Sequence, residues 1–114
     1  MTCAESDNVV CKHRSASITY YVDLNARLQP SVTVLSATAS TEDEDLTISQ
    51  VQVLDESLQI EEGSECQPRV LVANRAILIQ LTGGIPSDDE IIVTVQWAQS
   101  DGDEDALDCR VLVT

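Results

Sequence analysis

The sequence predicts an all-β chain folded as an antiparallel sandwich or barrel. Short segments rich in Val, Ile and Thr recur from Ile18 onward, and stretches of Gly, Pro, Asp and Ser separate them. No part of the chain sustains the apolar period of about 3.6 residues that marks a helix. There is no Phe, and only three residues are aromatic, so the core must be filled by aliphatic side chains that favour strands.

A chain of 114 residues is long enough for one hydrophobic core and too short for two ordinary domains. Residues 1–16 mix small and polar side chains without a sustained period, so they are expected to form an extended N-terminal arm that orders only against something else. A single β-domain is expected over 17–114. Its predicted strands cover residues 18–23, 32–40, 46–54, 57–60, 69–73, 75–81, 91–99 and 105–113.

Turn-forming residues separate most of the predicted strands. The separating stretches are Gln29–Pro30, Thr41–Asp45, Glu61–Gly63, Gly83–Gly84 and Ser100–Gly102. The glycine pair is interpreted as a turn and not as a phosphate-binding loop, because no helix is expected after it. Many short strands joined in this way favour antiparallel pairing.

The last two predicted strands are expected to form a hairpin in one register. A two-residue loop would place Val95 opposite Asp108 and bury charge against the core. A three-residue loop, Ser100–Gly102, instead places Val95 opposite Leu107. Its third position requires a positive φ, which glycine adopts at little cost. The three-residue loop is therefore predicted.

Charge limits the classes of partner. Twenty acidic residues against six basic ones give a net charge of −14, which disfavours nucleic acid and anionic membrane surfaces. No apolar run reaches the roughly 20 residues of a membrane span, and the N-terminus lacks the apolar stretch of a signal peptide. The chain is expected to be made in the cytoplasm, with its four cysteines starting as thiols.

The acidic run after Ser100 allows two interpretations. Asp101, Asp103 and Asp105 alternate like calcium ligands, but Ala106 and Leu112 stand where a helix-loop-helix calcium loop needs Gly and Glu. A looser calcium site, completed by residues 41–45 or 87–90 from a neighbouring loop, stays open. The favoured interpretation is a solvated hairpin end whose charge prevents aggregation.

Other sequence features do not predict a catalytic or metal centre. Cys3, Cys11 and His13 lack the tight ligand pairs of a zinc site. They also lack the fixed third group that an activated cysteine nucleophile needs. Cys109 lies on the inward face of its predicted strand and is interpreted as a small buried apolar residue. No cofactor and no enzymatic activity are expected.

Five short stretches carry a family resemblance: Tyr20–Leu28, Val34–Thr38, Leu81–Gly84, Ser100–Gly102 and Arg110–Val113. Together they resemble the small immunoglobulin-like proteins encoded among tailed-phage structural genes. Members of that group are described as fibre-to-tail adaptors, and similar sandwiches act as head decoration or cement proteins. The resemblance implies an immunoglobulin-like antiparallel β-sandwich of about seven or eight strands.

The chain departs from the family pattern in two ways. Leu24 and Arg27 stand where the family commonly has tryptophans, and Ile91 stands near a family aromatic. Residues 41–73 are longer than the family's middle section, so an additional hairpin is expected there.

The resemblance implies a non-enzymatic virion protein that docks onto capsid, tail or fibre proteins, with copies arranged symmetrically on the particle. Docking is expected through the arm, exposed strand edges and the middle insertion. The contact residues expected are Val9, Val10, Glu42, Asp43, Glu61 and Glu62. The alternative is a calcium-dependent binding module, for example for carbohydrate, that uses the acidic loops.

Overall fold

The computed structural model describes residues 2–3, 9–60 and 69–114, and these residues form strands and turns without a helix. The strands are β1 (Thr2–Cys3), β2 (Val9–Lys12), β3 (Ile18–Asp23), β4 (Val34–Thr41), β5 (Leu46–Val53), β6 (Leu58–Ile60), β7 (Arg69–Leu71), β8 (Ala76–Gly83), β9 (Ile91–Gln99) and β10 (Glu104–Val113). The predicted all-β class is confirmed.

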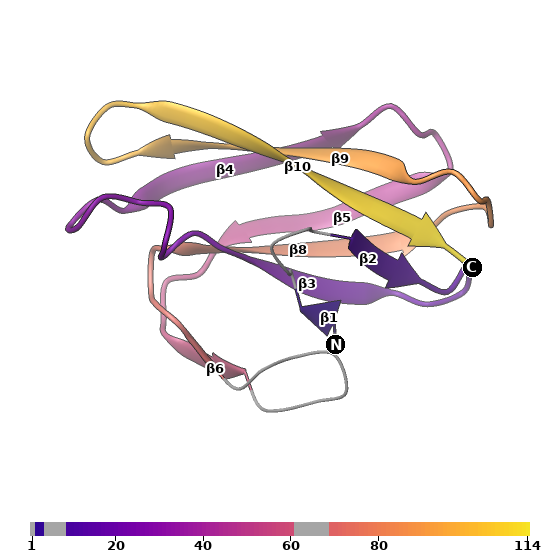
Figure 1. Cartoon of the computed structure of the whole chain (residues 1–114), viewed down its shortest axis with the longest axis horizontal. Coiled ribbons are helices and arrows are strands. Elements are labelled where there is room, and N and C mark those ends of the chain that lie inside the picture. Colours follow the sequence, from indigo (N-terminus) through magenta and orange to yellow (C-terminus); the bar gives the residue numbers. More distant parts are fainter. Residues whose placement is uncertain (1, 4–8, 61–68) are drawn as a thin grey trace.

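The strands form two four-stranded sheets and one separate hairpin. The first sheet has the order β1-β3-β8-β5, the second has the order β2-β10-β9-β4, and β6 pairs with β7. Figure 1 shows the second sheet lying across the first, with the β6 hairpin below them. Neighbouring strands are antiparallel except at β1–β3 and β2–β10, which are parallel. This two-layered arrangement is compatible with the predicted β-sandwich.

The core lies between the two sheets, where alternate residues of each central strand point inward. On β8 the inward residues are Ile77, Ile79 and Leu81, all fully buried. On β9 they include Val93 and Val95, which are also fully buried. The core joins both sheets in one cluster and is mainly aliphatic, as predicted.

The β9–β10 hairpin has the predicted register and loop. Val95 pairs with Leu107, and Val93 pairs with Cys109. Gly102 has a φ of 93°, and its N–H donates to the carbonyl of Gln99 at 3.0 Å, as in a type I turn followed by a glycine bulge. Because the side-chain period is two, this register keeps charge on the outer face of the sheet.

Most predicted strand ends lie within one residue of the observed ones, β8 extends two residues further, to Gly83, and two strands are shorter than predicted because turns intervene. β4 begins at Val34 and not at residue 32, since the Val32 N–H donates to the Gln29 carbonyl in a turn that includes Ser31 at a φ of 67°. β7 ends at Leu71, because a turn follows in which Asn74 has a φ of 63°.

The expected additional hairpin in the middle section is β6–β7. Its Leu71 is fully buried and packs with Ala76, and the partly buried Tyr21, Leu54 and Leu58 surround this pair. This small second core lies apart from the main one, on the outer face of the first sheet, where Tyr21 and Ala76 point outward from β3 and β8. Residues 61–68 between β6 and β7, including the expected contacts Glu61 and Glu62, lie outside the described residues.

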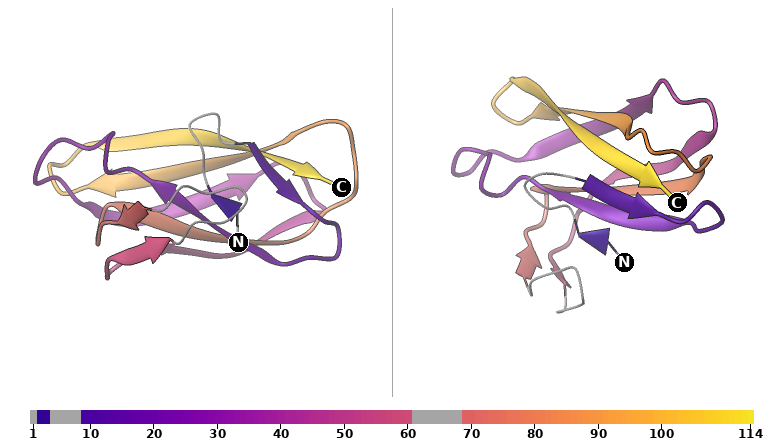
Figure 2. Two further views of the ribbon diagram at one scale, coloured as in Figure 1. Left: turned by 60° about the horizontal axis from the view of Figure 1, so that its bottom comes forward. Right: turned by 45° about the vertical axis from the view of Figure 1, so that its right-hand side comes forward.

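The expected N-terminal arm contributes a strand to each sheet. β1 pairs with β3, and β2 pairs with β10 through residues 9–12 (Figure 2). Lys12, at the end of β2, is 1% exposed, and its Nζ donates to the backbone carbonyl of His13 at 2.9 Å. Burial lowers the pKa of this lysine. The described part of the arm therefore orders against the β-domain itself.

Candidate docking surface

The outer face of the second sheet carries small and polar side chains along β4 and β9. Strand alternation points Ser36, Thr38 and Ser40 outward from β4, while Thr94 and Gln96 point outward from β9. Because most of these side chains are short, the face is hollowed at two places instead of being filled by long side chains. Each hollow is built from residues of β4 and β9 together with a loop or β10.

The larger hollow, here named the isoleucine hollow, has a volume of about 790 Å³. It lies where β4 ends and β9 begins, because Thr41 pairs with Val93. Its lining residues are Ser40, Thr41, Glu42, Asp43, Ile85, Ser87, Asp89, Glu90, Ile91, Ile92 and Thr94. It therefore combines isoleucine side chains with four carboxylates.

The two loops beside the isoleucine hollow are shaped by short-range hydrogen bonds. Asp43 Oδ1 accepts from the N–H groups of Asp45 and Leu46, at 2.9 and 3.1 Å, which closes the turn after β4. The Asp89 N–H donates to Ser87 Oγ at 3.0 Å in the loop before β9. Asp and Ser side chains commonly accept hydrogen bonds from nearby backbone N–H groups in turns.

A backbone contact joins these loops to one another. The Gly84 N–H donates to the carbonyl of Asp45 at 2.8 Å. Gly83 has a φ of 76°, and a Cβ added there would lie 2.8 Å from the same carbonyl oxygen. The predicted glycine turn thus allows the loop before β9 to approach the turn after β4 closely.

The second hollow, here named the polar hollow, has a volume of about 540 Å³ and lies further along β4 and β9. Its lining residues are Ser36, Ala37, Thr38, Gln96, Trp97, Ala98, Glu104, Asp105 and Ala106. Thr38 pairs with Gln96 and Ser40 pairs with Thr94, so the two hollows follow one another along the same strand pair.

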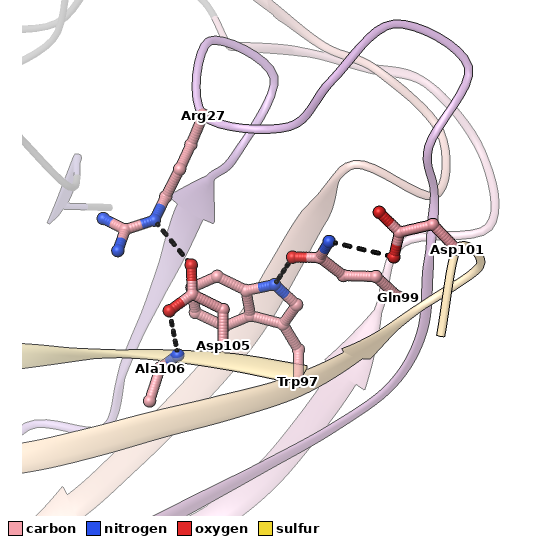
Figure 3. Close-up of polar contacts among 6 residues, drawn as sticks. All are labelled: Arg27, Trp97, Gln99, Asp101, Asp105 and Ala106. Carbon is pink, nitrogen blue, oxygen red and sulfur yellow. Dashed lines mark hydrogen bonds and ion pairs between the residues drawn. The ribbon is translucent and has the colours of Figure 1, made fainter. Parts of the chain in front are cut away.

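A chain of polar contacts lies at the β9–β10 turn, beyond the polar hollow. Figure 3 shows Arg27 beside the ring of Trp97, with Cζ 5.6 Å from the ring centroid and Nε 3.4 Å from Asp105 Oδ2. The indole N–H of Trp97 donates to Gln99 Oε1 at 3.0 Å. Gln99 Nε2 donates to Asp101 Oδ1 at 3.3 Å. Arg27 thus covers the aromatic ring by a cation–π contact.

Arg75 holds the loop that carries Arg27. Its guanidinium donates to the carbonyls of Asn25, Leu28, Gln29 and Val32 and to the side chain of Asn25. This set uses the fork-shaped donor geometry of arginine. The loop over residues 24–33 is therefore anchored to the β7–β8 turn.

Two of the three carboxylates proposed as calcium ligands, those of Asp101 and Asp105, have structural partners. Asp101 Oδ1 accepts from the Asp103 N–H at 3.0 Å, as well as from Gln99. Asp105 Oδ1 accepts from the Ala106 N–H at 2.8 Å. Among residues 2–3, 9–60 and 69–114, no group of three or more His, Cys, Asp or Glu is placed to hold a metal ion.

The looser calcium site was expected to combine the β9–β10 turn with residues 41–45 or 87–90. These segments do not lie near that turn. Residues 41–43 and 87–90 lie together at the isoleucine hollow. The turn at Asp101 follows the other end of β9, a nine-residue strand that extends about 26 Å at the usual rise per residue. Figure 1 shows the β4–β5 and β9–β10 turns at opposite ends of the molecule. The structure therefore brings together two of the three acidic segments.

The remaining sites considered from the sequence fall in several places. The backbones of Val9 and Val10 pair with Arg110 and Val111 of β10. Glu42 and Asp43, expected as partner contacts, line the isoleucine hollow. Cys3 and Cys11 lie in β1 and β2, on different sheets, and Cys66 lies outside the described residues.

Cys109 is fully buried with a free thiol, as its inward position predicted. Burial raises the pKa of this thiol, and the nearby Asp108 carboxylate adds to the rise. The buried hydroxyl of Tyr20 makes no hydrogen bond of regular geometry within the described residues, and it lies close enough to the Cys109 thiol to lower its pKa in part. Burial likewise raises the pKa of Tyr20.

Sequence reasoning missed Arg75 and the pair Ile85 and Ile92. No local pattern marks Arg75, because its partners lie more than forty positions away along the chain. A signal for Ile92 was present: strand alternation places this large apolar side chain on the solvated face opposite Arg110. A large aliphatic residue at an outward strand position, such as Ile92, is therefore the sequence signal for this candidate docking surface.

Comparison of the chain with protein-family models, curated proteins and solved structures finds no match. Among the described residues, no helix is long and apolar enough to cross a membrane.

Proposed function

We propose that the chain is a non-enzymatic attachment module of a tailed-phage virion, built on an immunoglobulin-like β-sandwich. It docks onto other virion proteins, of the capsid, tail or fibre. The single observation that carries this proposal is the order of the strands in the two sheets, taken with the family resemblance.

The strand order supports an immunoglobulin-like arrangement. In that arrangement, strands A, B, E and D form one sheet, and strands C, F and G form the other. The first sheet here has the order β1-β3-β8-β5, and the second contains β10-β9-β4. Assigned in chain order, β3 takes the place of B, β4 of C, β5 of D, β8 of E, β9 of F and β10 of G. The β6–β7 hairpin then becomes an insertion between D and E.

The positions of the resembling stretches support the phage assignment. Leu81–Gly84 covers the end of β8 and the residue after it, Ser100–Gly102 forms the β9–β10 turn, and Arg110–Val113 ends β10. The tryptophan that the family commonly has at position 27 is replaced by Arg27, which here covers Trp97 from the loop between β3 and β4.

The edge of the second sheet supports docking by strand addition. β4 is an edge strand of eight residues, Val34–Thr41, and carries no charged residue and no proline. Within the described part of the chain, no strand pairs with its outer side. An uncharged edge of this length is a template onto which an extended segment of another protein adds by backbone hydrogen bonds.

Net charge determines how copies are held on a particle. With −14 per chain, contacts between copies bring like charges together. A symmetric array is therefore held by the proteins beneath it, and the acidic loops keep neighbouring copies apart.

Quantitative mass spectrometry of purified particles of the phage that encodes the chain tests this proposal. The expected result is a constant copy number per particle that matches a symmetric site of the head, neck or tail. Complete absence of the chain from particles that contain all major structural proteins would reject the virion role.

A further inference from the structure

The isoleucine hollow exposes aliphatic surface that the fold itself does not need. Ile85 is 59% exposed and Ile92 is 44% exposed, while the neighbouring Ile91 is partly buried and packs against the core. Four large apolar residues are exposed in the described part of the chain, and two of them line this one hollow. The other two, Leu35 and Val70, line neither this hollow nor the polar hollow. An exposed apolar pair within a hollow is typical of an interaction site.

Acidic side chains surround the two isoleucines. Glu42 and Asp43 come from the turn after β4, and Asp89 and Glu90 come from the loop before β9. Glu90 Oε1 lies 3.5 Å from Arg110 Nη1, and Asp43 caps its own turn. Within the described residues, the carboxylates of Glu42 and Asp89 form no hydrogen bond or ion pair. These two carboxylates are therefore available to a positively charged partner.

The walls of the hollow are held in place before any partner arrives. The Gly84 N–H bonds to the Asp45 carbonyl and so links the two loops. The Ser87 N–H donates to the Val113 carbonyl at 3.2 Å, which attaches the second loop to β10. A site that is already ordered loses less entropy on binding.

We propose that the isoleucine hollow binds a segment of a partner protein in which an aliphatic side chain is flanked by basic ones. The aliphatic side chain packs between Ile85 and Ile92, and the basic side chains face Glu42 and Asp89. This inference rests on the proposed function in one respect, that the chain is a docking module, and adds the place and the chemistry of the partner.

Charge complementarity selects this partner over a second copy of the chain. A second copy carries the same net charge of −14, so its surface is repelled by the carboxylates around the hollow. An uncharged apolar segment would cover the isoleucines. It would also take the carboxylates of Glu42 and Asp89 out of water without offering them an opposite charge. A segment that is both basic and aliphatic satisfies both parts of the hollow.

Titration of the uniformly ¹⁵N-labelled full chain with synthetic peptides tests the inference. The probe is a short peptide with one isoleucine between arginines, compared with a matched peptide in which serine replaces the isoleucine. The expected result is that amide signals of residues 40–43, 85 and 87–94 move with the first peptide, which binds about tenfold more tightly than the second. Equal affinity of the two peptides would show attraction by charge alone and would overturn the inference.

Paired variants locate the site. Ile85→Ser with Ile92→Ser is expected to weaken binding about tenfold. The control, Leu35→Ser with Val70→Ser, removes two apolar side chains that are at least as exposed on average and lie elsewhere, and it is expected to leave affinity unchanged. Because all four side chains are exposed, both variants are expected to keep the melting temperature of the wild type.

A second pair tests the charges. Glu42→Gln with Asp89→Asn is expected to weaken binding and to flatten its salt dependence, whereas Asp103→Asn with Glu104→Gln, at the opposite end of β9, is expected to do neither. Equal effects of the two pairs would show that the carboxylates act only through the net charge of the chain, and this would overturn the inference. If the wild-type chain self-associates and Ile92→Ser abolishes the association, the occupant of the hollow is a second copy of the chain, and the basic partner is rejected.

These outcomes are distinct from a failure of the proposed function. Peptide binding at the hollow is measured on the isolated chain, and presence on the particle is measured by mass spectrometry. If the chain is absent from particles but still binds the peptide, the inferred site stands and the virion role is rejected.

Discussion

Arg75 donates a hydrogen bond from Nη1 to the backbone carbonyl of Val32, with the two atoms 2.6 Å apart. The same guanidinium also bonds to the carbonyls of Asn25, Leu28 and Gln29. One side chain from the β7–β8 turn therefore satisfies the polar backbone of a loop that begins fifty residues earlier. That loop carries Arg27 to its place over Trp97.

Replacing Arg75 tests this anchoring role. Arg75→Ala is expected to lower the free energy of unfolding by about 2 kcal/mol, because several carbonyl groups lose a charged donor. Arg75→Lys is expected to recover less than half of the loss, since an ammonium cannot reproduce the planar fork. Urea unfolding followed by Trp97 fluorescence provides the measurement. A change of a few tenths of a kcal/mol in Arg75→Ala would contradict the role.

The glycines of two turns differ in what surrounds them, and this difference is testable. Gly102→Ala is expected to cost about 1 kcal/mol, because a positive φ is strained for alanine while the space around the added Cβ is open. Gly83→Ala is expected to cost about 2 kcal/mol or more, since its Cβ would also meet the Asp45 carbonyl oxygen at 2.8 Å. Urea midpoints of the two variants give the comparison. The reverse order would show that the loops around the isoleucine hollow relax easily.

The buried Cys109 thiol makes stability depend on pH in the alkaline range. Its pKa is raised in the folded chain, so the unfolded chain loses this proton first as the pH rises. The stability that the thiol contributes is complete below the unfolded pKa of about 8.5 and decreases above it, by up to about 1.4 kcal/mol per pH unit.

The difference between wild type and Cys109→Ala isolates this effect from the other titrating groups. Urea unfolding between pH 7.5 and pH 9.5, chosen to bracket the thiol pKa of about 8.5, is expected to show the wild type losing stability relative to the variant. Parallel curves for the two proteins would mean that the thiol titrates alike in both states and is not buried.

Calcium is expected to leave the melting temperature of the chain unchanged. Asp101 and Asp105 already accept hydrogen bonds from backbone N–H groups, and the other acidic loops lie at the far end of β9. Scanning calorimetry with calcium, with magnesium and with a chelator gives the comparison. A rise of many degrees specific to calcium would favour the calcium-dependent binding module, because a ligand that binds the native state stabilises it.

The strands were predictable because their signals are local. Alternating apolar residues identify β9 and β10, and the position of Gly102 fixes the loop between them. The register then follows, since a shift by one residue would turn Asp108 toward the core.

The surface was less predictable because distant segments build it. The isoleucine hollow needs the turn after β4 and the loop before β9, which only the pairing of Thr41 with Val93 brings together. The parallel pairing of β2 with β10 likewise joins segments about a hundred residues apart and has no local pattern. The acidic residues are evident in the sequence, but the distances between their loops depend on the order of the strands in the sheets.

Hydrogen exchange of the chain on purified particles, compared with the free chain, tests most directly whether it docks through the outer face and edge of its second sheet. If the chain docks there, exchange on the particle is expected to be slower for β4 and for residues 85 and 87–92, and unchanged at the β9–β10 turn. Unchanged exchange in both β4 and residues 85 and 87–92, together with protection confined to the turn or to the β6–β7 hairpin, would contradict docking through this face and edge.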